Sequence, residues 1–204
     1  MKVKICGITN SEDAAYCESL GADALGFIFY NRSKRYVQPE VAAEIIKHLS
    51  PFTIKVGVFV NETSDSINNI STLLHLNAAQ IHDEENVIDR KSIIVPVIRS
   101  FRVKDNFDFS ILNNLDNNYF ILDSYSQNEF GGTGKSFNWE LIPESIKKKT
   151  ILAGGISSTN IDYICRKIRP AAVDLSSSLE AQPGTKDKEK VKEFFYKFNK
   201  YRSN

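Results

Sequence analysis

The chain has 204 residues, of which 42% are hydrophobic and 25% charged, and its formal net charge is +1. We expect one domain over residues 1–204, because this length can bury a substantial core. The balanced charge gives no general electrostatic case for binding nucleic acid or membrane surfaces, and no apolar run is long enough to cross a bilayer. Three widely spaced cysteines form neither a disulfide framework nor a zinc spacing, which favours a cytoplasmic protein.

Apolar runs of strand length alternate with helix-patterned segments along the whole chain. The predicted strands are Val3–Cys6, Ala24–Phe29, Ile54–Val60, Ala78–Ile81, Ile93–Ile98, Tyr119–Asp123, Thr150–Ala153 and Ala172–Leu175. The predicted helices are Ser11–Leu20, Pro39–Leu49, Thr63–Leu76, Glu84–Lys91, Trp139–Lys148, Thr159–Ile168 and Lys186–Tyr201. After the fifth strand, Val103–Asn117 indicates only a short helix or an irregular segment.

This alternation predicts a parallel sheet with right-handed crossovers. Eight strand-like runs, each followed by a helix except after the fifth, favour an α/β fold of the closed (β/α)₈, or TIM, barrel type. The alternative is an open doubly wound sheet. Such a sheet usually has fewer strands and often a G-x-G-x-x-G first turn, whereas the first turn here has a single glycine, Gly7.

In a (β/α)₈ barrel the catalytic groups lie at the C-terminal ends of the strands and in the loops that follow. A thiol, a carboxylate, two guanidinium groups and several small residues are expected to converge at that end. They are Cys6, Arg35, Asn61, Gln80, His82, Arg99, Asp123, Gly154, Gly155, Ser176 and Ser177.

Cys6 and Asp123 are the two candidates for proton transfer. Cys6 ends the first apolar run and is either a small buried side chain or a reactive thiol, whose thiolate would need nearby positive charge. Asp123 follows four apolar residues, so partial desolvation should raise its pKa and suit it to general acid catalysis. The alternative is a capping or loop aspartate.

Small residues follow the seventh and eighth strands, where barrels commonly bind phosphate. Gly154 and Gly155 would let backbone N–H groups approach an anion, and Ser176 and Ser177 would lie beside them. Tight turns without a ligand are the alternative interpretation.

Three further features belong to the predicted barrel mouth or interior. The Gly-rich segment Phe130–Lys135, with Gly132, lacks P-loop spacing and is interpreted as a lid. One histidine near the mouth, His82, does not make a metal site, so no metal is expected. Lys4 and Asp174 share strand faces with Cys6 and Ser176, so the two are expected to pair inside the barrel.

Taken in order, the motifs of the chain resemble the phosphoribosylanthranilate isomerase family of tryptophan biosynthesis over almost its whole length. The motifs are Lys4–Thr9, Gly21–Asp23 with Gly26-Phe27, Ser33–Arg35, Val56–Asn61, Leu122–Ser124, Gly131–Gly134, Leu152–Ile156 and Val173–Ser177. The resemblance implies an Amadori rearrangement, an aldose–ketose isomerisation of N-(5-phosphoribosyl)anthranilate to 1-(2-carboxyphenylamino)-1-deoxyribulose 5-phosphate, without a cofactor.

The same resemblance assigns roles by position. Asp123 resembles the general acid and Cys6 the general base, and Arg35 resembles the group that holds the anthranilate carboxylate. Gly154, Gly155, Ser176 and Ser177 would hold the phosphate, and their donors together with Arg35 are expected to favour the Cys6 thiolate. Gln80, His82 and Gly132 are further candidates at the mouth.

The chain departs from the family pattern at two glycines, which are Asp83 and Ser178 here. Alternatives left open are a non-catalytic barrel that binds a phosphorylated metabolite, or another phosphosugar isomerase. A metal-dependent pentose-phosphate epimerase would need more ligands than His82, and the analogous isomerase of histidine biosynthesis is expected to carry Asp in place of Cys6. A monomer that binds neither nucleic acid nor membrane is expected.

Overall fold

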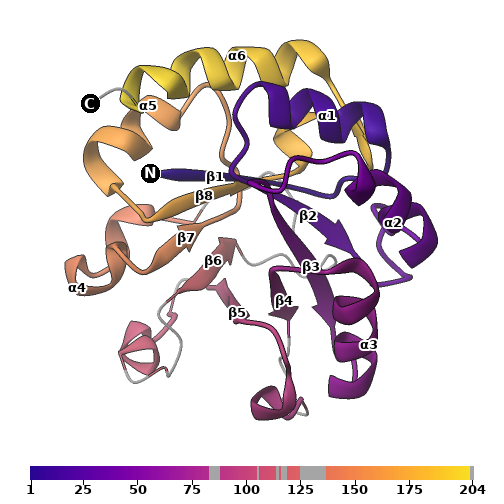
Figure 1. The fold of residues 1–204 in the computed structure, drawn as a ribbon. Coiled ribbons are helices and arrows are strands. Elements are labelled where there is room, and N and C mark those ends of the chain that lie inside the picture. Colours follow the sequence, from indigo (N-terminus) through magenta and orange to yellow (C-terminus); the bar gives the residue numbers. More distant parts are fainter. Residues whose placement is uncertain (83–87, 105, 114, 116–118, 125–136, 203–204) are drawn as a thin grey trace.

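Parallel strands close into a barrel surrounded by helices (Figure 1). The structure, a computed structural model, describes residues 1–82, 88–104, 106–113, 115, 119–124 and 137–202. Within these residues eight strands are hydrogen-bonded in the order β1 to β8, and β8 pairs with β1 to close the ring. The predicted TIM-barrel fold is therefore confirmed, and the open-sheet alternative is wrong.

The strands follow the predicted apolar runs closely at most positions. They are β1 (Lys2–Cys6), β2 (Ala24–Ile28), β3 (Ile54–Val60), β4 (Ala78–His82), β5 (Val97–Val103), β6 (Phe120–Ser124), β7 (Thr150–Leu152) and β8 (Ala172–Leu175). Only the fifth differs substantially, because it begins after Pro96 rather than at Ile93. Proline has no N–H to donate to a ladder, and here it contributes only its carbonyl oxygen, which accepts from Ala79 N at 2.9 Å.

The first half of the barrel has well-formed helices with recognisable start signals. They are α1 (Ser11–Ser19), α2 (Pro39–Lys47) and α3 (Ser64–Leu74). The N-cap of α1 is Asn10, whose side chain accepts from Asp13 N at 2.8 Å, and Pro39 is the first residue of α2, as expected.

The second half is covered by shorter helical pieces. Between β4 and β6 the described residues hold the 3-10 turns η1 (Arg90–Ser92) and η2 (Phe109–Leu112); the expected helix over 84–91 lies partly outside the described residues. The helix expected over 139–148 is instead a turn, η3 (Trp139–Leu141), and a short α4 (Glu144–Lys147), because Pro143 cannot continue a helix. Likewise α5 (Ile161–Tyr163) passes into the π-helical turn η4 (Ile164–Ile168).

The C-terminal segment packs a hydrophobic helix face against the barrel. A short hairpin, β9 (Glu180–Gln182) and β10 (Thr185–Lys186), follows the turn η5 (Ser177–Leu179) and leads into α6 (Lys188–Phe198) and η6 (Asn199–Tyr201). Val191, Phe194, Phe195 and Phe198 recur at helical spacing and are all buried, so they form the face of α6 that packs on the barrel.

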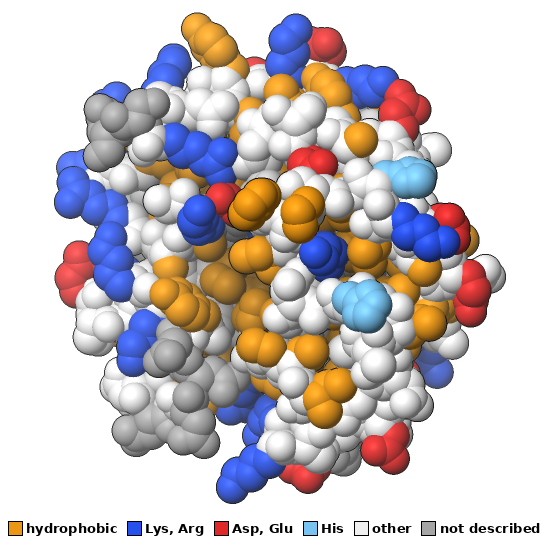
Figure 2. All heavy atoms as spheres, in the orientation of Figure 1, with side chains coloured by type: hydrophobic (Ala, Val, Ile, Leu, Met, Phe, Trp, Pro, Cys, Tyr) orange, Lys and Arg blue, Asp and Glu red, His pale blue; other side chains and the backbone are white. Residues whose placement is uncertain are grey.

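The outer surface carries most of the charge. In the view of Figure 2, charged side chains lie mainly around the periphery, and hydrophobic side chains gather towards the centre of the face. Several large hydrophobic side chains are exposed, among them Phe52, Ile94 and Tyr119. None of the helices within the described residues is long and apolar enough to cross a membrane.

Candidate active site

One cavity lies at the C-terminal ends of the strands and gathers most of the predicted site residues. We call it the site cavity. Residues from seven strands or the loops after them line it: Cys6, Ile28, Tyr30, Ser33, Arg35, Val58, Val60, Gln80, His82, Asp123, Ala153, Gly154, Gly155, Ile156, Asp174, Leu175, Ser176, Ser177 and Ser178. The convergence predicted from the strand ends is therefore observed.

Cys6 ends β1, and its neighbour across the sheet leaves room for its thiol. Gly26 of β2 is paired with Cys6, and a Cβ on Gly26 would lie 2.8 Å from Cys6 Sγ. Burial raises the pKa of the Cys6 thiol above its ordinary value, against the lowering effect of Lys4. The cations that lower the pKa of Cys6 are Lys4 and Lys186, and the expected effect of Arg35 on the thiolate stays a prediction.

Asp123 lies on β6 and is buried, as the preceding apolar residues predict. Its Oδ1 accepts from Ser124 N at 2.8 Å. Burial, with the negative charge of Asp174 as the second cause, raises the pKa of Asp123 to about 6. The burial of this carboxyl agrees with the sequence, and its role as a general acid stays a prediction.

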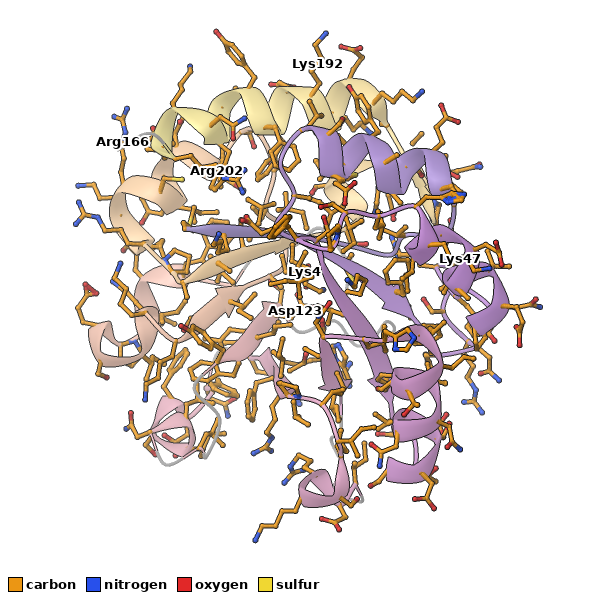
Figure 3. The ribbon with its side chains drawn as sticks, in the orientation of Figure 1. Lys4, Lys47, Asp123, Arg166, Lys192 and Arg202 are labelled. Carbon is orange, nitrogen blue, oxygen red and sulfur yellow. The ribbon has the colours of Figure 1, made fainter. Side chains whose placement is uncertain are left out.

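Below these two residues Lys4 and Asp174 form the predicted ion pair inside the barrel. They face each other in the register of β1 and β8, with Lys4 Nζ 2.9 and 3.0 Å from the two carboxylate oxygens. Figure 3 shows Lys4 and Asp123 near the middle of the ring of strands, whereas labelled cations such as Lys47 lie at the periphery. The pair therefore contributes to the electrostatics of both Cys6 and Asp123.

Arg35 comes from the loop after β2, lines the site cavity and is held by Glu180. Its Nε donates to the carboxylate oxygens of Glu180 at 2.9 and 3.0 Å, and its Nη2 donates at 2.7 Å. Gly7 makes this path possible, because a Cβ there would lie 2.8 Å from Arg35 Cδ. Gly7 has a φ of 76°, which suits glycine.

The loop after β7 brings backbone close to the acid. Gly154 has a φ of 81°, and a Cβ on it would lie 2.7 Å from Asp123 Oδ1. Asn160 fixes this loop, since its side chain donates to Gly155 O at 2.8 Å and accepts from Ser157 N at 3.0 Å. Gly154 therefore allows close packing against Asp123, whether or not the loop also binds an anion.

The loop after β8 adds hydroxyl groups next to that backbone. Ser176, Ser177 and Ser178 all line the site cavity, so the serine that replaces a family glycine at position 178 is part of its wall. Ser176 Oγ is buried and, among the described residues, has no hydrogen-bond partner. An orphaned buried hydroxyl facing a cavity is suited to a polar ligand.

Gln80 and His82 stand two residues apart on β4 and so share its inner face. Gln80 Nε2 and His82 Nε2 are 3.0 Å apart, and both residues line the site cavity. Gln80 Oε1 is buried and lacks a hydrogen-bond partner within the described part of the chain. Both residues are therefore placed as predicted.

The remaining predicted mouth residues differ from the expectation or fall outside the structure. Arg99 lies within β5 because that strand begins late, and its guanidinium covers the Phe101 ring at 4.8 Å instead of joining the site cavity. Asn61 directly follows β3, with its N–H donating to His82 O at 3.1 Å. Gly132, the Phe130–Lys135 segment and Asp83 lie outside the described residues.

Sequence reasoning missed Glu180 and Lys186. Both are buried charges in the hairpin after β8, and both contact residues of the site. Glu180 lies two residues after Ser178, so the available signal was an acidic residue close behind the loop expected to bind phosphate.

Among the described residues, no group of three or more His, Cys, Asp or Glu side chains is placed to hold a metal ion. The fold and the cavity define a (β/α)₈-barrel protein whose mouth combines one buried carboxylic acid, one thiol, an arginine and a small-residue loop pair.

Comparison with known proteins gives the family. Residues 3–197 match the family described as N-(5'phosphoribosyl)anthranilate (PRA) isomerase. The N-(5'-phosphoribosyl)anthranilate isomerases of Trichlorobacter lovleyi and Bacillus cereus are 43% and 42% identical to the chain. The alignment with the first covers 95% of this chain and 96% of the relative, and that with the second covers 97% of each.

Solved structures agree. The phosphoribosyl anthranilate isomerase from Thermotoga maritima superimposes with a TM-score of 0.87 at 39% identity, covering 98% of this chain and 99% of that one. A phosphoribosyl anthranilate isomerase in complex with reduced 1-(o-carboxyphenylamino)-1-deoxyribulose 5-phosphate gives 0.84 at 36% identity with the same coverage. The chain belongs to the N-(5'-phosphoribosyl)anthranilate isomerase family and is an isomerase of tryptophan biosynthesis.

Proposed function

We propose that Asp123 is the general acid and Cys6 the general base of this isomerase. The observation that carries the proposal is that both side chains line one cavity, with the pKa of Asp123 raised to about 6 so that it holds a proton in mildly acidic solution. An aldose–ketose shift needs one acid and one base at neighbouring atoms, and no redox group.

The reaction then runs in two proton transfers. Asp123 gives its proton to the furanose ring oxygen, the bond from that oxygen to C1 breaks, and the nitrogen lone pair forms a protonated Schiff base. Cys6, as the thiolate, takes the proton from C2, and the electron pair of that C–H bond forms the C1=C2 double bond of an enolamine. Tautomerisation of the enolamine gives the ketose. The thiol returns its proton through solvent, and Asp123 is reprotonated.

The two ends of the substrate are assigned to different residues of the site cavity. The planar guanidinium of Arg35 is suited to the anthranilate carboxylate. Gly154, Gly155, Ser176 and Ser177 form the phosphate side, supported by the unpartnered Ser176 hydroxyl group. Gln80 and His82, whose side chains also line the cavity, are assigned to the sugar between them.

We further propose that the protein acts as a monomer in the cytoplasm. Its three cysteines are free, which fits a reducing compartment. A monomer has a mass of 23.0 kDa. Light scattering on the protein as it elutes from a size-exclusion column measures the mass in solution. Twice that mass would contradict the monomer, and the exposed Phe52 and Tyr119 are the side chains to examine in that case.

Substitution at the two proton-transfer residues tests the roles. We expect Cys6→Ala and Asp123→Ala each to lower kcat by about 10²-fold or more while KM changes little, because the acid and the base act in the transition state. The conversion is followed by the loss of anthranilate fluorescence. A near wild-type kcat in either purified, folded variant would overturn that residue's role.

A further inference from the structure

The hairpin after β8 carries two buried charges that the proposed chemistry leaves unused. Glu180 and Lys186 are 6% and 4% exposed. Lys186 Nζ donates to Glu180 Oε1 at 3.0 Å and to the backbone oxygen of Cys6 at 2.7 Å. Because burying charges is costly unless they are paired, this arrangement calls for a reason beyond packing.

The other face of Glu180 holds Arg35. The carboxylate accepts from Nε and Nη2 along one edge of the guanidinium, and the N–H of Gly184 approaches the same carboxylate at 3.4 Å. A continuous chain of contacts therefore runs from Arg35 through Glu180 and Lys186 to the peptide of Cys6. It joins the arginine on one side of the site cavity to the backbone of the thiol residue.

We propose that Glu180 and Lys186 are positioning residues for the isomerisation. Glu180 fixes the position of the Arg35 guanidinium at the site cavity, where the guanidinium would bind the carboxylate of an N-aryl substituent on the sugar. Lys186 anchors the Cys6 peptide and places a positive charge near its thiol. The inference rests on the proposed roles of Arg35 and Cys6.

The hairpin has other anchors that do not need these two charges. Asp13 Oδ2 accepts from Lys186 N at 2.7 Å, Asp187 N donates to Leu179 O at 2.8 Å, and Thr9 Oγ1 donates to Gly184 O. The neutral variants Glu180→Gln and Lys186→Met leave all three contacts in place. We therefore expect them to fold, with their effects confined to the residues that they position.

Glu180 is tested through Arg35. We expect Glu180→Gln to raise KM about tenfold with kcat within about twofold. The reason is that a misplaced Arg35 would bind the substrate carboxylate less well in the ground state and in the transition state alike. In the Arg35→Ala background the same substitution should raise KM no further, since contacting residues couple in a double-mutant cycle. Glu44→Gln, at an exposed pair with Lys47 on α2, is the matched control and should leave both constants unchanged.

Additive effects of Glu180→Gln and Arg35→Ala on KM would overturn the role of Glu180. If Arg35→Ala itself leaves KM unchanged, the role of Arg35 in substrate binding fails instead. The two failures are thus distinguishable.

The role of Lys186 is tested by measuring the reactivity of the Cys6 thiol, which needs no turnover of substrate. The charged groups that act on Cys6 are Lys4, Asp174 and Lys186. We measure the rate of Cys6 alkylation by iodoacetamide against pH in a Cys165→Ser background, in which the only other thiol, Cys17, is buried and has its pKa raised to about 12. We expect Lys186→Met to shift this profile to higher pH and to lower kcat with KM little changed.

Lys186→Gln loses the same charge and should shift the profile in the same direction, which covers the case in which the methionine variant does not fold. An unchanged alkylation profile in a folded Lys186 variant would overturn the role of Lys186. Because the alkylation needs no catalysis, this result is independent of whether Cys6 is the base.

Discussion

At the residue scale, the proposed roles require unusual protonation states of the acid and the base. The proposed acid, Asp123, has its pKa raised to about 6, and burial raises the pKa of the Cys6 thiol above its ordinary value. The active form needs Asp123 protonated and Cys6 deprotonated, which is the reverse of their ordinary states at neutral pH. Because both pKa values are raised, only a small fraction of the free enzyme has this form.

The pH dependence of kcat/KM follows from these two values. Below about pH 6 the active form grows with pH, because thiolate forms while Asp123 stays protonated. Above pH 6 the gain in thiolate is cancelled by the loss of protonated Asp123, so we expect a plateau that falls only when the thiol has titrated. Asp123→Asn should abolish the break near pH 6, so that its residual activity continues to rise.

Steady-state rates from pH 4.5 to 10, corrected for stability, measure this dependence. A wild-type kcat/KM that begins to fall near pH 6 would contradict the account, because it would mean that the thiol is already deprotonated in that range.

At the element scale, the contact between β1 and β8 closes the barrel around a buried ion pair. Asp174→Asn leaves Lys4 without its counter-charge, and we expect a loss of about 3–5 kcal/mol in the free energy of unfolding. The double variant Lys4→Met with Asp174→Leu should recover much of this loss, because it removes both desolvated charges. Urea unfolding measures both, and Lys47→Met at an exposed pair is the control.

If Asp174→Asn and Lys47→Met lowered the free energy of unfolding equally, the claim that burial makes the loss of the counter-charge costly would be wrong. A double variant less stable than Asp174→Asn alone would show that the pair is a net source of stability.

The barrel strands differ in how deeply the described parts of the chain bury them, and β5 is the least buried. Most of its residues are half-buried, whereas β4 is buried throughout, and only short turns are described beside it. We expect the β5 amides to exchange hydrogen faster than those of β2 and β3, through local opening on that side. Native-state exchange measured by NMR tests this, and equal protection of β2 and β5 would contradict it.

The same contrast shows what the sequence could predict. Apolar runs bounded by polar residues predicted β3 and β8 to the residue, because strands that are buried on both faces are nearly continuous hydrophobic runs. Strand β5 begins after Pro96, and the helix expected over 139–148 is broken at Pro143. Both boundaries could have been predicted, because proline cannot donate to a strand ladder or continue a helix.

At the site, residues at strand ends could be predicted because the barrel topology brings them together. Cys6, Gln80, His82 and Asp123 are such residues, and all four line the site cavity. The ion pair of Arg35 with Glu180 spans 145 residues of sequence, and the contact of Lys186 with Cys6 spans 180. No local pattern contains such pairings, so they required the structure.

At the scale of the whole molecule, the barrel gathers the proposed acid, the proposed base and the residues proposed to bind the substrate from distant parts of the chain into one cavity. The central claim is the division of labour between Asp123 and Cys6. It predicts that each substitution slows a different step, ring opening for Asp123 and removal of the C2 proton for Cys6.

The most direct test is the deuterium isotope effect with substrate labelled at C2, measured in single turnovers of Cys6→Ser and Asp123→Asn. The account predicts a large primary isotope effect in Cys6→Ser, where removal of the C2 proton becomes rate-limiting, and none in Asp123→Asn, where ring opening limits the rate. A primary isotope effect in Asp123→Asn with none in Cys6→Ser would contradict the assignment of acid and base.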